Sequence, residues 1–226
     1  MLIGYGWMLW FCGPSYSIGG YGLKGNFSLP FTIAGFILLL TGIFQKNKID
    51  LKAFGSAALG LLYISTSWGM MLDLYRTTDF YTHDTMYVVA GYTIPVILIA
   101  SIWINDTMAY IVGSFIGRRP LSKISPKKTW EGTIGGIILS IGVVGFLLPL
   151  LFYPQNGFGF SLILCIIAGI AAIAGTFGDL LESKLKRMAG VKDSGRIMPG
   201  HGGFLDRFDS LLVATPFVWI FVKSIL

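Results

Sequence analysis

Charged side chains are scarce in this chain of 226 residues, in which Asp, Glu, Lys and Arg together make up 12%. A soluble globular domain carries about 25% charged residues, so the composition argues against a soluble protein. Cysteine and histidine are also scarce, with two residues of each. Cys12 and Cys165 lie in apolar runs, which argues against a disulfide framework. Without clustered cysteines or histidines, a transition-metal site is not expected either.

Apolar runs fill most of the remaining sequence. A helix that spans a bilayer needs about 20 apolar residues, and seven stretches reach or approach that length. They lie at about residues 1–13, 30–45, 53–72, 86–104, 132–153, 160–179 and 210–226. We therefore expect an all-α, polytopic integral membrane helix bundle of about seven segments. It should form a single domain over residues 1–226, with N-terminal spans in 1–100 and a motif-bearing core in 101–226.

Basic residues are distributed unevenly between the two ends of these segments. If the segments alternate in direction, loops 46–52, 105–131 and 180–209 share one side and hold 14 of the 17 Lys and Arg residues. Such loops face the cytoplasm in most membrane proteins. The net charge of +6 is thus explained by orientation and not by nucleic-acid binding. We predict a multi-pass protein of the plasma membrane whose polar loops are cytoplasmic, with its active site at that interface.

The first polar loop contains a run that begins at Ser125-Pro126 and continues with Lys127 and Lys128. Serine followed by proline is a typical helix start, so we expect both lysines in a first helical turn. Free backbone amides there already favour anions, which predicts a phosphate contact. The competing interpretation is that the lysines bind anionic lipid headgroups at the membrane surface.

Two carboxylates flank this loop, each within a few residues of an apolar segment, where an acid usually has a function or a partner. Asp106 is a candidate metal ligand, and the alternative is a structural ion pair with Arg118 or Arg119. For Glu131 the structural interpretation is favoured.

Paired carboxylates border the last polar loop. Asp179 and Glu182 are three residues apart, as are Asp206 and Asp209, so each pair should share one helix face. Mg²⁺ binds through oxygen ligands from one or two carboxylates together with substrate phosphates. Two such pairs at one membrane depth predict a Mg²⁺ site. For Glu182 the competing interpretation is a helical ion pair with Lys186.

A glycine-rich turn lies between these pairs and includes His201, Gly202 and Gly203. Glycine permits close backbone approach to a ligand, and successive amides in such a turn can bind an anion. His201 is a candidate acid–base group or phosphate donor, or an ordinary loop residue.

These residues together resemble the signature of the phosphatidate cytidylyltransferases. The resemblance is carried by Ser183, Lys186-Arg187, Lys192-Asp193, His201-Gly202-Gly203 and Asp206-Arg207-Phe208-Asp209. The earlier Asn105-Asp106-Thr107 and Ser125 to Gly132 resemble the second block of that family. The similarity covers residues 100–210.

The resemblance implies transfer of CMP from CTP to phosphatidic acid, which yields CDP-diacylglycerol and pyrophosphate. The implied Mg²⁺ ligands are Asp179 and Asp206, followed by Asp209, Glu182 and Asp106, with or without a second, monovalent cation. The implied substrate contacts are Ser125, Lys127, Lys128, Lys192, His201, Gly202, Gly203 and Arg207. The implied catalytic groups are Asp179, Asp206, Lys128, Lys186, Arg187 and His201. The implied partners are CTP, phosphatidic acid and the lipid bilayer, with no nucleic acid, and a homodimer is compatible with the family and the glycine-lined spans.

Two other functions fit parts of the pattern. A CTP-dependent polyprenol or phytol kinase would transfer the γ-phosphate to a lipid alcohol and release CDP. A cation-conducting bundle would carry charge near the bilayer midplane, whereas the acids here cluster at one interface.

Overall fold

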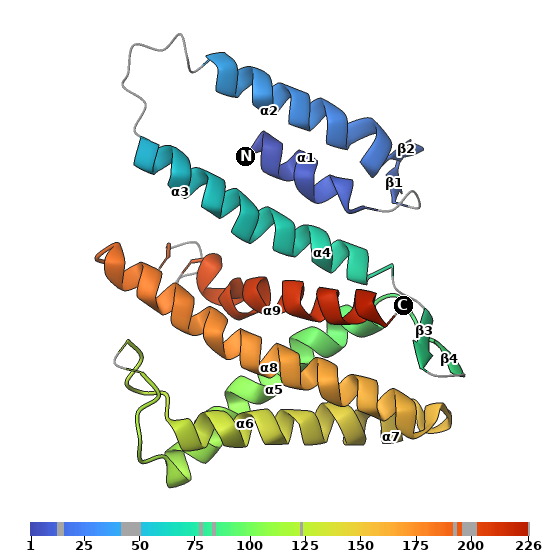
Figure 1. The fold of residues 1–226 in the computed structure, drawn as a ribbon, viewed down its shortest axis with the longest axis vertical. Coiled ribbons are helices and arrows are strands. Elements are labelled where there is room, and N and C mark those ends of the chain that lie inside the picture. The colour runs from blue at the N-terminus through green and yellow to red at the C-terminus, as the bar shows by residue number, and fades with distance from the viewer. Residues whose placement is uncertain are drawn as a thin grey trace. The chain divides into compact units, whose positions relative to one another are not determined.

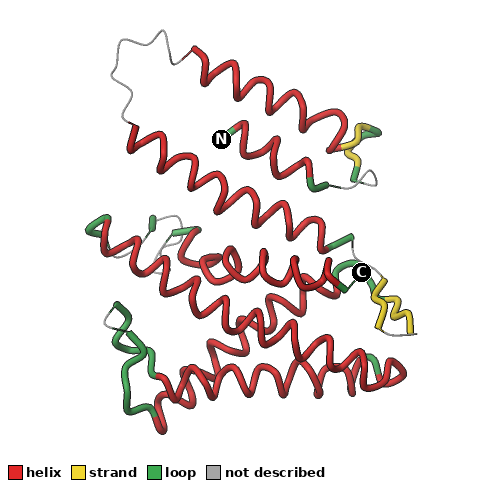
Figure 2. Tube along the Cα trace, viewed as in Figure 1, coloured by secondary structure: helices red, strands yellow, loops and turns green. Residues whose placement is uncertain are grey.

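The structure is a computed structural model that describes residues 1–12, 16–41, 51–76, 79–82, 85–122, 124–191, 194–195 and 203–225. Helices dominate these residues, and the strands among them form two short hairpins (Figures 1 and 2). The chain divides into two compact units, Met1–Thr77 and Thr78–Leu226. The expectation of a single domain with a division near residue 100 stays a prediction.

The first unit is built from helices that pack through small residues. Its elements are α1 (Leu2–Trp10), β1 (Ser17–Ile18), β2 (Tyr21–Gly22), the π-helical turn η1 (Leu23–Ser28), α2 (Leu29–Thr41), α3 (Leu51–Leu61), the π-helical turn η3 (Leu62–Thr66) and α4 (Ser67–Leu74). The Ser28 hydroxyl donates to the Gly6 carbonyl at 2.9 Å, and a methyl group on Gly35 would lie 2.7 Å from the Ile3 nitrogen. Helices α1 and α2 are therefore in close backbone contact.

The second unit carries the polar motifs. Its elements are β3 (Asp79–Thr82), β4 (Thr85–Val88), α5 (Thr93–Ile116), α6 (Trp130–Gly142), the π-helical turn η4 (Val143–Leu147), α7 (Leu148–Phe152), the 3₁₀ turn η5 (Pro154–Asn156), α8 (Gly157–Met188) and α9 (Leu205–Ser224). Helix α5 packs against both α6 and α8, and α9 runs along α8 (Figure 1). Leu98, Leu164 and Val218 are fully buried where these helices meet.

Small side chains set the helix spacing in this unit. A methyl group on Gly136 of α6 would lie 2.7 Å from the Asn105 carbonyl oxygen of α5, and one on Gly178 of α8 would lie 2.7 Å from the Asp209 carbonyl oxygen of α9. The buried Ser140 hydroxyl donates to the Ser101 carbonyl at 2.9 Å. Close backbone approach and interhelical hydrogen bonds are typical of membrane helices.

The predicted all-α membrane bundle is confirmed. Five helical stretches of the described chain are long and apolar enough to cross a bilayer: Leu23–Thr41, Gly55–Leu74, Thr93–Ile116, Trp130–Phe152 and Pro154–Met188. The other two predicted segments, 1–13 and 210–226, are also helical, as α1 with nine residues and α9 with 20 residues.

The predicted helix start at Ser125-Pro126 is wrong. Helix α6 begins at Trp130, and the Thr129 side chain caps it by accepting the Gly132 amide. Helix α5 also extends to Ile116, so Asp106 lies within a helix and not in a loop. The polar segment between these helices covers residues 117–129 and carries both lysines.

We predict that Gly136→Ala lowers the free energy of unfolding by about 1–3 kcal/mol, since the added methyl group overpacks the α5–α6 contact. Gly142→Ala on the same helix is the matched control, because its methyl group meets no atom within 4 Å. Thermal unfolding in detergent measures both. Equal melting temperatures for the two variants would contradict the close α5–α6 contact.

Candidate functional site

The polar motifs meet at one end of the second unit. Segment 117–129, the end of α8 and the start of α9 lie at the same end of the helices (Figure 1). The direction reverses from α5 to α6 and again from α8 to α9, which explains why segments far apart in the sequence converge there. The C-terminal half of α5, from Asn105 and Asp106 onward, borders the same region.

Glu131 holds segment 117–129 in place. Its carboxylate accepts the backbone amides of Arg118 and Arg119 at 3.1 and 3.2 Å. The Leu121 amide donates to the Lys128 carbonyl at 2.7 Å, which closes the segment on itself. The favoured structural interpretation of Glu131 agrees with this geometry.

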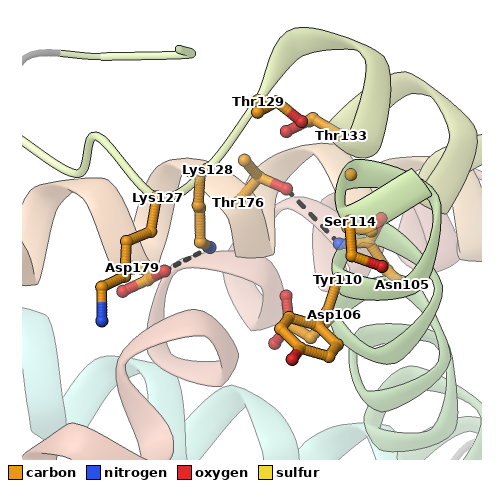
Figure 3. Close-up of a pocket in the computed structure, with 12 residues that line it drawn as sticks. Asn105, Asp106, Tyr110, Ser114, Lys127, Lys128, Thr129, Thr133, Thr176 and Asp179 are labelled. Carbon is orange, nitrogen blue, oxygen red and sulfur yellow. Dashed lines mark hydrogen bonds and ion pairs between the residues drawn. The ribbon is translucent and has the colours of Figure 1, made fainter. Parts of the chain in front are cut away.

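A cavity of about 330 Å³ lies between α5, α6 and α8, under this segment (Figure 3). Lys127, Lys128, Asp106 and Asp179 supply its charged walls. Its neutral polar lining consists of Asn105, Tyr110, Ser114, Thr129, Thr133 and Thr176. The Lys128 ammonium forms an ion pair with the Asp179 carboxylate.

Asn105 is the most deeply buried polar group of this cavity, with 1% of its surface exposed. Its amide nitrogen lies 3.4 Å from the Thr176 hydroxyl, which itself donates to the Ala172 carbonyl. Among the described residues, the side-chain oxygen Oδ1 of Asn105 has no hydrogen-bond partner. A buried acceptor without a partner is costly, so this oxygen is suited to a ligand donor in the cavity.

Three carboxylates gather beside the cavity. Asp179, Glu182 and Asp209 each place one oxygen within 4.8 Å of the other two. Glu182 is 1% exposed and Asp209 is 8% exposed, and Glu182 Oε1 has no hydrogen-bond partner among the described residues. Carboxylates so close together repel one another unless a cation lies between them or one of them holds a proton. This donor set, all oxygen and one oxygen unpaired, fits a hard divalent metal ion.

Lys186 connects this cluster to Asp206. Its ammonium lies 2.8 Å from Glu182 Oε2 and 2.7 Å from Asp206 Oδ1, so the predicted helical ion pair is present. Glu182 and Asp206 therefore share one ammonium group, that of Lys186.

Asp206 also ties the start of α9 to the preceding loop. Its Oδ2 accepts the Ser194 amide at 2.8 Å, the Ser194 hydroxyl at 2.7 Å and the Gly203 amide at 2.7 Å. Burial alone would raise the pKa of Asp206, but the hydrogen bonds from Lys186, Ser194 and Gly203 outweigh it and hold the pKa well below the usual carboxyl range. The carboxylate is therefore ionised at neutral pH.

The other predicted site residues are spread more widely. The backbone carbonyl of Ser125 accepts the Lys128 amide within segment 117–129. Arg187 and Arg207 are exposed on α8 and α9. Lys192, His201 and Gly202 lie outside the described residues. Sequence reasoning did not single out Asn105, Thr133 or Thr176 as site residues. Only Asn105 carried a signal, through its place beside Asp106.

The fold and the site together define a membrane-embedded protein whose polar end can hold a cation and an anionic ligand side by side. Comparison with known proteins narrows this class. The model of the cytidylyltransferase family matches residues 1–225, and the chain belongs to that family.

The relatives agree with this assignment. The chain is 43% identical to the phosphatidate cytidylyltransferase of Synechocystis sp., over 87% of this chain and 71% of the relative. It is 36% identical to the Staphylococcus saprophyticus phosphatidate cytidylyltransferase, over 84% of this chain and 67% of the relative. Chloroplastic phosphatidate cytidylyltransferase 4 of Arabidopsis thaliana is 33% identical, over 88% of this chain and 54% of the relative. The chain thus spans about half the length of the Arabidopsis relatives it matches.

We predict that Asp206→Asn lowers the free energy of unfolding by about 1–3 kcal/mol in EDTA, because an amide cannot replace the charged acceptor of these hydrogen bonds. Thermal unfolding in detergent is the measurement. The control is Asp73→Asn, which weakens an exposed ion pair with Arg76 and should change stability by less than about 1 kcal/mol. Unchanged stability of Asp206→Asn in EDTA, with loss of stabilisation by Mg²⁺, would instead make Asp206 a metal ligand without an anchoring role.

Proposed function

We propose that the protein transfers CMP from CTP to phosphatidic acid, forming CDP-diacylglycerol and pyrophosphate for phospholipid biosynthesis. The observation that carries this proposal is the three-carboxylate cluster beside the lysine-lined cavity, at the polar end of a membrane bundle of the cytidylyltransferase family. Relatives named phosphatidate cytidylyltransferase at 33–43% identity support it.

The reaction needs two anions to meet. A phosphate oxygen of the lipid attacks the α-phosphorus of CTP, a new P–O bond forms, and the bond to the β-phosphate oxygen breaks. Pyrophosphate leaves with the bonding electrons. The lipid phosphate is already a competent nucleophile, so the protein has to supply orientation and charge stabilisation only.

We propose Mg²⁺ as the cation of the acidic cluster. Asp179, Glu182 and Asp209 would hold it, and Asp206, kept beside Glu182 by Lys186, stays a proposed further ligand, as does Asp106 on the cavity wall. When bound, the ion would neutralise phosphate charge and stabilise the leaving pyrophosphate. Glu182 contributes the feature that most supports this proposal, namely its buried Oε1, which has no hydrogen-bond partner in the part of the chain that the structure describes.

Basic side chains would bind the phosphates. Lys127 and Lys128 would bind the CTP phosphates in the cavity between α5, α6 and α8. Once a cation binds Asp179, Lys128 can exchange its ion pair with Asp179 for a phosphate oxygen. The further proposed phosphate contacts are Ser125, Lys186, Arg187, Lys192 and Arg207. His201, Gly202 and Gly203 are proposed to border the nucleotide.

The distribution of basic residues also suggests an orientation in the membrane. If the five candidate spans cross a bilayer in alternating directions, the sequence loops 42–54, 117–129 and 189–204 would share one side, and we propose that this side faces the cytoplasm because it is rich in Lys and Arg. The plasma membrane as location, a homodimer and a second, monovalent cation stay predictions.

The test is an assay of purified protein in mixed micelles with phosphatidic acid, CTP labelled at the α-phosphorus, and Mg²⁺ or EDTA. We expect Mg²⁺-dependent label in the lipid with an equal amount of pyrophosphate. Release of CDP when a polyprenol replaces phosphatidic acid, without label in phosphatidic acid, would contradict the proposal and favour a lipid kinase.

Asp209→Asn sharpens the assay. We expect a loss of rate on the order of 100-fold or more, because the substitution removes a charge from the proposed metal site. Asp73→Asn in the first unit is the matched control and should retain the wild-type rate. Comparable rates for both variants would exclude Asp209 from the site.

A further inference from the structure

A second cavity, of about 500 Å³, lies between α5 and α9. Its apolar lining consists of Ile99, Ile102 and Trp103 of α5 and Phe208 and Leu211 of α9, and its polar lining of Asp106, Asp206, Arg207, Asp209 and Ser210. Trp103 is 71% exposed, so one side of the cavity opens outward, away from the core of the second unit. We call this cavity the α5–α9 groove.

The groove changes character along α5. Three further lining residues of α5 follow Ile99 at distances of three, four and seven residues: Ile102, Trp103 and Asp106. All four therefore share one helix face. Seven residues of helix span about 10 Å. The groove thus runs along α5 from a carboxylate end toward an apolar end. At its polar end it also contains Asp206, Arg207, Asp209 and Ser210.

The two cavities flank the three-carboxylate cluster. Asp106 lines both of them, Asp179 lines the cavity between α5, α6 and α8, and Asp209 lines the α5–α9 groove. The lysines Lys127 and Lys128 belong to the first cavity alone. A metal ion held between Asp179 and Asp209 would therefore be reached from two sides, one with two lysines and the other with Arg207 and a row of apolar side chains.

We infer that the α5–α9 groove binds the phosphatidic acid, with the phosphate at the Arg207 and Asp209 end and the acyl chains along Ile99, Ile102 and Trp103. This inference rests on the proposed CMP transfer. CTP takes the lysine-lined cavity, so the lipid oxygen and the pyrophosphate lie on opposite sides of the α-phosphorus. That is the roughly in-line arrangement that phosphoryl transfer requires.

The wall of the groove favours a lipid over a second nucleotide. Isoleucine and leucine offer no hydrogen bonds to a base or a ribose, whereas they match acyl chains. The exposed Trp103 ring adds a large apolar surface to this wall. Arg207 supplies a planar donor suited to a phosphate.

Photo-crosslinking tests the inference without turnover. Phosphatidic acid that carries a diazirine on one acyl chain is bound to the whole protein in EDTA, irradiated, and the labelled peptides are identified. We expect label within Ile99–Trp103 that unlabelled phosphatidic acid removes and CTP does not. Label that unlabelled phosphatidic acid removes, but that lies outside Ile99–Trp103, overturns the inference.

Kinetics separate the two cavities. Trp103→Ala and the groove-filling Ile99→Trp should each raise the apparent KM for phosphatidic acid about tenfold, with the KM for CTP unchanged. Lys128→Ala should do the reverse. Phe115→Ala, which removes an 83% exposed aromatic of α5 that lines neither cavity, is the matched control for Trp103→Ala.

Failure of this inference is distinguishable from failure of the proposed function. A wild-type protein that labels phosphatidic acid with CMP, while Trp103→Ala and Ile99→Trp leave the KM for phosphatidic acid unchanged, overturns the groove and leaves the function intact. Competable crosslinks at Ile99–Trp103 without any CMP transfer support the groove and overturn the function.

Discussion

The close approach of α8 and α9 is the constraint on which the site depends. Gly178 lets the backbone of α9 lie against α8, and this contact brings Asp209 to Asp179 and Glu182. Glu182 and Asp209 are buried there, and the Lys186 ammonium lies beside Glu182. Carboxylates so close together are stabilised by a cation or by a proton, so the packing of α8 and α9 creates the site at which the proposed metal ion would bind.

The membrane bundle gives this arrangement its chemical meaning. Apolar helices fix the depth of the carboxylates at one end of the second unit, where a water-soluble nucleotide and a lipid phosphate can both arrive. Segment 117–129, held by Glu131, covers the side with Lys127 and Lys128. The α5–α9 groove provides the side on which the apolar residues of α5 border the site. The cluster therefore lies where two substrates of opposite solubility can meet.

Much of this site could be predicted from the sequence, because helical spacing is a local property. The three-residue separations of Asp179 from Glu182 and of Asp206 from Asp209 place each pair on one face, and α8 and α9 are helical there. The start of α6 could not be predicted from Ser125-Pro126, since the Thr129 cap and the tertiary contacts of Glu131 outweigh a local signal. Thr133 and Thr176 are ordinary helix residues in sequence, and only the packing of α5, α6 and α8 brings them to one cavity.

The central claim is that one divalent ion lies between the two cavities. The most direct measurement is anomalous diffraction at the manganese edge from crystals grown with Mn²⁺ and a non-hydrolysable CTP analogue. The account predicts an anomalous peak within about 2.6 Å of carboxylate oxygens from α8 and α9, Asp179 and Asp209 among them, beside the nucleotide phosphates. A bound nucleotide without such a peak, or with its Mn²⁺ held away from these carboxylates, would contradict it.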